Sequence, residues 1–227
     1  MTGKQRRPEP AAHGRAASTS KAAVVVAHPD DETLWAGGLI LSHPERQWMI
    51  AALCRASDPD RAPKFRRVTK RLGAMGGMAD LDDGPDQEPL DPSLIEATIL
   101  ELLPAGPWDL LVTHSPAGEY TRHRRHEETA AAVIRLWTSG RLPAKELWLF
   151  AYSDDERQRL PTAIADAHRR LTLPDGVWRE KYALITEVYG FGKDGFEART
   201  TPRLEAFWCF RQPAALRRWL DRQGQCA

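Results

Sequence analysis

A short apolar segment that ends abruptly in charged residues constrains this chain most. Residues 22–27, Ala-Ala-Val-Val-Val-Ala, contain no polar side chain and are rich in β-branched valine. Runs of this length and composition are typical of strands buried on both faces, which occur inside parallel sheets. The next residues, His28-Pro29-Asp30-Asp31-Glu32, supply an imidazole and three carboxylates. The sequence therefore predicts an interior strand with a polar site at its carboxyl end.

The rest of the chain alternates between strand-like and helix-like segments. We predict further strands at 48–53, 108–113, 146–152 and 204–210, and helices at 33–42, 62–75, 90–103, 126–137, 179–189 and 213–223. Such alternation favours an α/β fold with a mostly parallel sheet and right-handed crossovers. We find no internal repeat and no domain linker. We therefore expect a single Rossmann-like domain over residues 21–227, with helices flanking the sheet.

Composition excludes several classes of protein. The chain has 227 residues, is 42% hydrophobic and has a net charge of +1, so it can bury a core and gives no reason to expect nucleic-acid binding. No apolar run approaches the roughly 18 residues of a membrane span. Residues 1–20 are rich in Arg, Pro, Ala and Ser, and we expect a disordered leader. The widely spaced Cys54, Cys209 and Cys226 exclude a disulfide framework and a cysteine zinc cluster, and a cytoplasmic location is expected.

The acidic segment after the first strand is a candidate metal site. Adjacent carboxylates raise each other's pKa unless a cation neutralises them, and a divalent metal would do so. His28 and Asp31 are three residues apart, so both can face one point on a tight turn or a helix start. Asp30 would then lie beside the metal without binding it. The alternative is an ordinary turn in which Asp30 or Asp31 caps the following helix.

A second polar segment, residues 113–128, follows the strand at 108–113 and contains His123 and His126. In open α/β sheets, ligands bind outside the carboxyl ends of strands, where both segments are expected. One of these histidines can join His28 and Asp31, which gives two imidazoles, one carboxylate and an open position, the layout of a catalytic zinc site. The same donor set also suits Fe²⁺. The alternative is a solvated, charged helix start whose histidines are incidental.

These two segments resemble the motifs of a known family. Ala27-His28-Pro29-Asp30-Asp31-Glu32, followed by Gly37-Gly38, is similar to the A-H-P-D-D-E signature of the LmbE-like (PIG-L) zinc-dependent N-deacetylases. Residues 113–126 resemble the family's T-H…G-E-Y-G-H-P-D-H stretch. The resemblance runs from Ala22 to Trp137 and extends towards Tyr152. The family includes the de-N-acetylase of N-acetylglucosaminyl-phosphatidylinositol and the deacetylases of mycothiol and bacillithiol synthesis.

The resemblance implies a role for each matching residue. His28, Asp31 and His126 would bind zinc, and Asp30 would be the general base. His123 would stabilise the oxyanion or protonate the leaving amine. Two further matches complete the set: Glu32 would orient a ligand, and Tyr120 would contact the substrate.

The second motif departs from the family pattern in two ways. Arg124-Arg125 stands where the family carries Pro-Asp or Pro-Gln, so the group that supports His123 is missing. Arg122 adds one residue between Tyr120 and His123. The family also uses an arginine after the second strand to hold the substrate. Arg61 is our candidate for that role, and the other candidates are Arg55, Arg66 and Arg67.

The implied function is zinc-dependent removal of an N-acetyl group from a small N-acetylglucosamine-type sugar or glycoconjugate, by a chain that can form a homo-oligomer. One alternative is an amidase that acts on a thiol or sugar conjugate with the same metal site. Another is a catalytically silent binding protein of the same fold, suggested by Arg124-Arg125. An Fe²⁺ oxygenase is disfavoured by the strand–helix alternation, and a dinucleotide-binding domain by the absence of G-x-G-x-x-G.

Other residues leave two interpretations open. Trp108, Trp148 and Trp208 lie in predicted strands and should be core, whereas Trp35 belongs either to the core or to the rim of the pocket. Asp82-Asp83 either approaches the pocket or ends a short strand. We expect substrate specificity to lie in residues 57–64 and in the region after Tyr152.

Overall fold

The structure is a computed structural model that describes residues 19–120 and 122–224. Residues 1–18 of the predicted disordered leader lie outside the described residues. Cys226 lies outside them too. Within the described residues, no helix is both long enough and apolar enough to cross a membrane.

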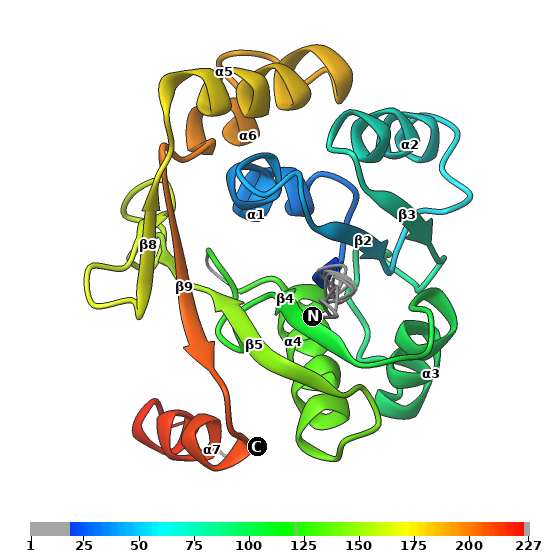
Figure 1. Cartoon of the computed structure of the whole chain (residues 1–227). Coiled ribbons are helices and arrows are strands. Elements are labelled where there is room, and N and C mark those ends of the chain that lie inside the picture. The colour runs from blue at the N-terminus through cyan, green and yellow to red at the C-terminus, as the bar shows by residue number, and fades with distance from the viewer. Residues whose placement is uncertain (1–18, 121, 225–227) are drawn as a thin grey trace, which may run out of the picture.

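A seven-stranded sheet forms the centre of the molecule, in the order β3-β2-β1-β4-β5-β9-β8 (Figure 1). The bounds of its strands are β1 Lys21–Val26, β2 Gln47–Ala52, β3 Met75–Met78, β4 Trp108–Thr113, β5 Ala144–Phe150, β8 Arg169–Thr172 and β9 Leu204–Phe210. The first five strands are parallel, whereas β9 runs antiparallel to both β5 and β8. A small antiparallel pair, β6 (Tyr152–Ser153) and β7 (Thr162–Ala163), follows β5. The predicted α/β fold with a mostly parallel sheet is confirmed.

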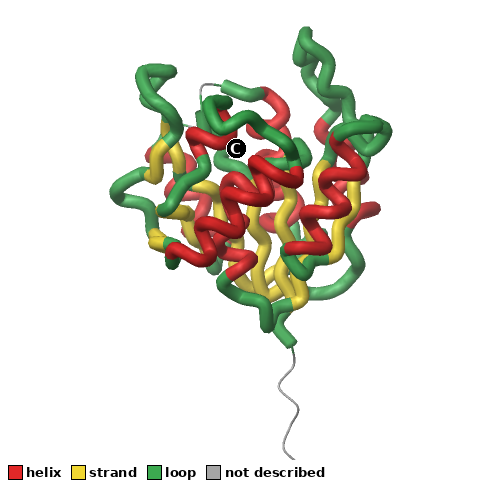
Figure 2. Tube along the Cα trace, turned by 90° about the horizontal axis from the view of Figure 1, so that it is seen from above, coloured by secondary structure: helices red, strands yellow, loops and turns green. Residues whose placement is uncertain are grey.

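Helices cover both faces of the sheet (Figures 1 and 2). Their bounds are α1 Asp31–Leu41, α2 Arg61–Arg71, α3 Pro92–Leu102, α4 Arg124–Thr138, α5 Asp175–Ala183, α6 Phe196–Thr200 and α7 Pro213–Arg222, and α5 continues as a π-helix, Leu184–Val188. Helices α1, α2 and α6 and the π-helix pack on one face, and α3, α4 and α7 on the other. Strand β1 contributes side chains to the core on both faces of the sheet. Val24 packs on the side of α1 and α2, Val25 packs on the side of α3 and α4, and both are fully buried. This explains why its apolar run is continuous.

The structure corrects the prediction of a helix over 62–75. Helix α2 ends at Arg71, and the edge strand β3 follows. The sequence Met-Gly-Gly-Met lacks the β-branched residues that signal a strand. Glycine is nevertheless needed at position 76, because a Cβ there would come within 2.9 Å of Phe65 and Thr69 of α2. The structure also adds β6, β7, β8 and α6, which we did not predict.

The pairing of β1 with β4 places the two polar segments together. The two strands are parallel, and Val25 lies opposite Thr113. The order reverses at this point, since β2 and β3 lie on one side and β5 on the other. The Thr113 hydroxyl donates to the Val25 carbonyl (2.8 Å), and the Ala27 N–H donates to Nε2 of His114 (3.0 Å). The carboxyl ends of both strands therefore open onto the crevice where such sheets bind ligands.

Two adjacent glycines of α1 provide a matched test of packing. A Cβ at Gly38 would lie 2.3 Å from Leu173 and 2.8 Å from the Glu205 carboxylate, whereas the nearest atom to a Cβ at Gly37 is 3.4 Å away. We expect Gly38→Ala to lower the free energy of unfolding by about 1–3 kcal/mol through overpacking. Gly37→Ala should be neutral or stabilising by up to about 1 kcal/mol, because alanine favours helix. Urea denaturation of both variants is the measurement, and equal effects would contradict this packing.

Candidate metal centre and active site

The short connection between β1 and α1 contains a strained residue, Asp30. Asp30 has a φ of 126°, a region that residues other than glycine rarely adopt. Its carbonyl accepts the N–H groups of Thr33 (3.0 Å) and Leu34 (2.8 Å), and its N–H donates to Glu32 (3.0 Å). The first turn of α1 therefore holds the strained residue in place, as is common at functional sites. Glu32 supports the backbone of Asp30 and also accepts the Tyr189 hydroxyl (2.7 Å).

Three donor atoms from the two polar segments meet in front of this turn. The Nδ1 atom of His28 lies 3.2 Å from Oδ2 of Asp31 and 3.2 Å from Nε2 of His126. The third side of the triangle, from Nε2 of His126 to Oδ2 of Asp31, is also 3.2 Å. A tetrahedral ion with bonds of about 2.0–2.1 Å places its ligands roughly 3.3 Å apart. The three predicted ligands are thus brought together at a separation that suits one metal ion.

Carboxylates behind the two imidazoles orient their lone pairs towards this point. His126 Nδ1 contacts Glu119 (2.7 Å), and His28 Nε2 contacts Asp83 (3.1 Å). An ionised carboxylate only accepts hydrogen bonds, so each imidazole carries its N–H on the outer side and its lone pair inwards. Burial alone would lower the pKa of His126, but Asp31 and Glu119 raise it to about 10. The centre therefore attracts a cation.

Asp31 is held by a residue that the sequence left ambiguous. The indole N–H of Trp35 donates to Oδ1 of Asp31 (3.2 Å), and Trp35 is fully buried. Trp35 therefore belongs to the core and not to the rim of the pocket. The backbone N–H of His28 donates to Oδ2 (3.0 Å). Burial would raise the pKa of Asp31, yet His126 and His114 hold it well below its ordinary value.

His114 and Glu119 contact the donor cluster, and neither was assigned a role from the sequence. Asp31, His114 and His126 form one set of potential metal donors, and His28, His123 and His126 form another. However, Nε2 of His114 already accepts the Ala27 N–H, so its Nδ1–H is directed to Glu119 (2.9 Å). Glu119 thus accepts from two imidazoles, and burial, which would raise its pKa, is outweighed by His114 and His126, which lower it to about 2. The only signal for Glu119 in the sequence is its place in Gly118-Glu119-Tyr120.

A cavity of about 170 Å³ lies beside the three donors. Its walls include the predicted base and both predicted substrate residues, Asp30, Arg61 and Tyr120. The Arg61 guanidinium lies 3.2 Å from Oδ2 of Asp30 and stacks 4.5 Å above the Phe191 ring. Burial and the charge of Asp31 raise the pKa of Asp30 well above its ordinary value, and Arg61 opposes this rise.

The other arginine candidates take different positions. Arg55 borders the same cavity but forms a fork with Asp83 through Nε (3.0 Å) and Nη2 (2.6 Å). Arg66 and Arg67 are exposed on α2, and neither lines this cavity. Among the described arginines, Arg61 therefore best matches the predicted substrate contact.

His123 borders the same cavity and lacks the support that the family motif would provide. Its ring stacks on His126, with centroids 4.5 Å apart, but its Nδ1 is buried without a hydrogen-bond partner among the described residues. Arg125, which stands where the motif has its acidic or amide residue, instead contacts Asp82, Glu88 and Glu128. Burial, followed by the charges of His126 and His28, lowers the pKa of His123 to about 4. The neutral imidazole is therefore favoured.

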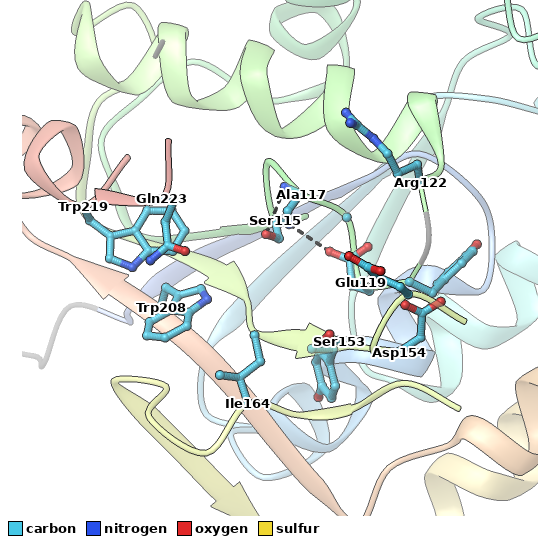
Figure 3. Close-up of a pocket in the computed structure, with 14 residues that line it drawn as sticks. Ser115, Ala117, Glu119, Arg122, Ser153, Asp154, Ile164, Trp208, Trp219 and Gln223 are labelled. Carbon is cyan, nitrogen blue, oxygen red and sulfur yellow. Dashed lines mark hydrogen bonds between the residues drawn. The ribbon is translucent and has the colours of Figure 1, made fainter. Parts of the chain in front are cut away.

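A larger cavity, of about 570 Å³, shares Tyr120 with the first, and Figure 3 shows its lining. Trp208 and Trp219 line one end, and Glu119 and Asp154 the other. Glu119 and Tyr120 thus connect this cavity to the donor cluster. Residues just after Tyr152 line it, and their role in substrate specificity stays a prediction. The three tryptophans assigned to the core, Trp108, Trp148 and Trp208, are buried.

The Glu119 carboxylate should be indispensable to this arrangement. The imidazoles of His114 and His126 both contact Oε2 of Glu119, and Oε1 accepts the Ser115 N–H (2.8 Å). The NH2 group of Glu119→Gln must therefore face either the imidazoles or this N–H, and an unsatisfied buried donor costs about 1–3 kcal/mol. We expect the free energy of unfolding, measured by urea denaturation in the presence of a chelator, to fall by that amount. Glu101, an exposed residue of α3, provides the matched control Glu101→Gln. A Glu119→Gln protein as stable as this control would contradict the hydrogen-bond assignment.

Several solved structures are similar to this chain in fold, although their sequences differ widely from it. No family model matches the chain. The N,N'-diacetylchitobiose deacetylase of Pyrococcus horikoshii is 14% identical, with a TM-score of 0.61 over 86% of this chain and 85% of that one. The zinc-inhibited form of a teicoplanin deacetylase is 11% identical, with a TM-score of 0.59 over 85% and 99%.

A third similar structure has another activity. It is the 4-carboxy-2-hydroxymuconate hydratase of Pseudomonas putida, 18% identical, with a TM-score of 0.57 over 91% of this chain and 88% of that one. At such low identities the likeness establishes the fold and not the reaction. The chain therefore has the fold of the LmbE/PIG-L-type deacetylases, as its motifs led us to expect.

Proposed function

We propose that this protein is a metal-dependent amide hydrolase that removes the N-acetyl group from an N-acetylglucosamine-type sugar or glycoconjugate. The observation that carries the proposal is the triangle of donor atoms from His28, Asp31 and His126, 3.2 Å on each side, next to Asp30. Two of the similar structures are deacetylases, one named for diacetylchitobiose and one for teicoplanin. Location in the cytoplasm and a homo-oligomeric state remain predictions.

The donor set suits Zn²⁺, and Fe²⁺ binds the same ligand types. Either ion, once bound, supplies Lewis acidity that polarises the amide carbonyl and makes a neighbouring water easier to deprotonate. One similar structure is described as the zinc-inhibited form of a teicoplanin deacetylase. Metal assays should therefore compare Zn²⁺ with Fe²⁺ at one equivalent before higher concentrations are used.

Asp30 takes the proton from the attacking water. It lies in the cavity beside the donors but outside their triangle, and its strained backbone keeps it there. Water adds to the amide carbonyl, the C–N bond breaks, and acetate and an amine are released. Asp30 then carries the proton to the departing nitrogen, because Nδ1 of His123 has no hydrogen-bond partner among the described residues that would stabilise the charged form.

His123 and Arg61 act on the substrate in different ways. A neutral His123 donates one N–H to the negative charge that develops on the carbonyl oxygen, so the hydrogen-bond role is favoured over the acid role. Arg61 holds the carboxylate of Asp30 and, with Tyr120, contacts the substrate at the cavity wall. The larger cavity beyond Tyr120 leaves room for the part of a glycoconjugate that lies beyond the sugar.

Substitutions should separate metal binding from turnover. Asp30→Asn should keep one metal ion per chain and lose at least about a hundredfold in kcat, the usual contribution of a general base. His126→Ala should lose the metal as well. His43→Ala, which removes a histidine paired only with Glu45, is the control. Metal content by elemental analysis and kcat on one substrate are the measurements, and stoichiometric metal in His126→Ala would refute the ligand assignment.

A product screen tests the reaction itself. The chain, stripped with a chelator and reloaded with Zn²⁺ or Fe²⁺, is incubated with N-acetylated sugars, and both acetate and free amine are measured. We expect equal amounts of the two products and none without metal. Release of another acid would favour the amidase alternative. Metal binding without any product would favour a silent binding protein. In a parallel incubation with an unsaturated carboxylic acid, its hydration would favour the reaction of the hydratase that shares the fold.

A further inference from the structure

The carboxylate of Asp83 is unusually well held for a residue on a loop. Oδ1 accepts from Nε2 of His28 (3.1 Å) and from the amide of Gln87 (3.0 Å). Oδ2 accepts both arms of the Arg55 fork (3.0 and 2.6 Å). Every strong acceptor direction of the carboxylate is therefore used, and one of them ends on a proposed metal ligand.

Only one orientation of the His28 ring satisfies these contacts. With Nε2–H directed at Asp83, Nδ1 points towards Asp31 and His126. A ring rotated about its Cβ–Cγ bond would lose the hydrogen bond to Asp83 and turn a C–H towards the other donors. Asp83 thus selects both the tautomer and the rotamer of His28, which is the usual function of a carboxylate behind a ligand histidine.

Arg125 holds the loop that carries Asp83. Its side chain is buried, and it extends from α4 to residues 82–88. The guanidinium donates to the carbonyl of Asp82 and to that of Glu88 (2.7 Å), and it pairs with Glu128 (2.5 Å). A buried guanidinium is tolerated only when such partners satisfy it. The two loop carbonyls flank Asp83, so Arg125 ties both ends of this stretch to the helix that supplies His126.

The loop is conformationally strained between these two anchors. Gln87 has a φ of 49°, in the left-handed region, and its amide donates to Asp83 (3.0 Å) and to the Gly84 carbonyl (3.1 Å). Arg55, on the opposite side of Asp83, also has a positive φ, of 69°. Strained residues persist where surrounding contacts determine their conformation. The loop is therefore built to present Asp83 at one position.

We propose that Asp83 is a positioning residue that fixes His28 for metal binding, and that buried Arg125 keeps Asp83 there by clamping residues 82–88 to α4. Arg125 occupies the position where the motif has an acidic or amide residue beside His123. In this chain that position supports His28, through Asp83, instead of His123. The inference rests on the proposed metal site, and it adds a group of residues on which the affinity of that site depends.

Zinc affinity, measured by competition with a chromophoric chelator, tests the role of Asp83. We expect Asp83→Ala to weaken binding by about 10–100-fold, the range typical of a lost carboxylate behind a ligand histidine. Asp83→Asn should recover part of the loss, because its amide oxygen still accepts from His28. Asp86→Asn, on the exposed part of the same loop, is the matched control and should match the wild type.

A spectroscopic measurement separates positioning from general stability. The visible absorption of the Co²⁺-loaded protein reports ligand geometry, and it should change in Asp83→Ala but not in Asp86→Asn. A wild-type chain that fails to bind one metal ion would overturn the proposed function together with this inference. A wild type that binds, with Asp83→Ala equal to it in affinity and spectrum, would overturn this inference alone.

Arg125→Lys tests the clamp without removing the buried charge. Lysine can still pair with Glu128 but cannot also reach the two loop carbonyls. We expect weaker zinc binding in the same direction as for Asp83→Ala, and faster amide hydrogen exchange over residues 82–88. If Arg125→Lys does not fold, Gln87→Ala, which removes one support of Asp83, carries the test with the same two measurements. Unchanged affinity and exchange in the folded variant would overturn the clamp.

Discussion

The parallel pairing of β1 with β4 is the constraint on which the site depends. Neighbouring parallel strands end at the same edge of a sheet, so residues some ninety positions apart in sequence become neighbours in space. The Ala27 N–H extends this pairing one step beyond the strands by donating to His114. That contact leaves the other ring nitrogen of His114 to donate to Glu119, and Glu119 in turn orients His126. The pairing of β1 with β4 thus determines, through His114 and Glu119, which way the lone pair of His126 points.

The buried carboxylates around the three donor atoms differ in how their negative charge is balanced. Buried Glu119 is satisfied by two imidazole N–H groups, and Asp83 by Arg55 together with Gln87 and His28. Asp31, by contrast, directs one oxygen towards nitrogens of His28 and His126, so its charge calls for a proton or a metal ion between these three atoms. Glu119 and Asp83 thus already have partners of their own, and the charge of Asp31 is left to attract a cation to the space between the donors.

The parts of the molecule that could be predicted are those with a local signal. The strand at 108–113 and the helix starting at Pro213 match the structure because burial and capping patterns extend over consecutive residues. Convergence of His28, Asp31 and His126 followed from the rule that ligands bind at the ends of parallel strands. Other features depend on contacts between segments that are distant in sequence.

Arg125 is the clearest feature of that second kind. A second arginine in a charged helix start gives no indication that it is buried or that its partners are backbone carbonyls of another loop. The strand β3 is similar, since Met-Gly-Gly-Met becomes a strand only because α2 packs so closely on Gly76. In both cases the tertiary contact determines the local structure.

Solved structures that share this fold include a hydratase as well as a deacetylase, so the fold alone does not select the reaction. Adding water to an unsaturated acid and adding it to an amide both require a water molecule that a nearby base can deprotonate, so three donors and Asp30 would serve either chemistry. Amide cleavage additionally requires a proton for the nitrogen and a hydrogen bond for the oxyanion. In the proposed reaction Asp30, which is paired with Arg61, would supply the proton, and His123, which lines the same 170 Å³ cavity, would supply the hydrogen bond. Under the proposed mechanism, activation of water at the donors is needed for either reaction, whereas the proton for the nitrogen and the hydrogen bond to the oxyanion are what amide cleavage requires in addition.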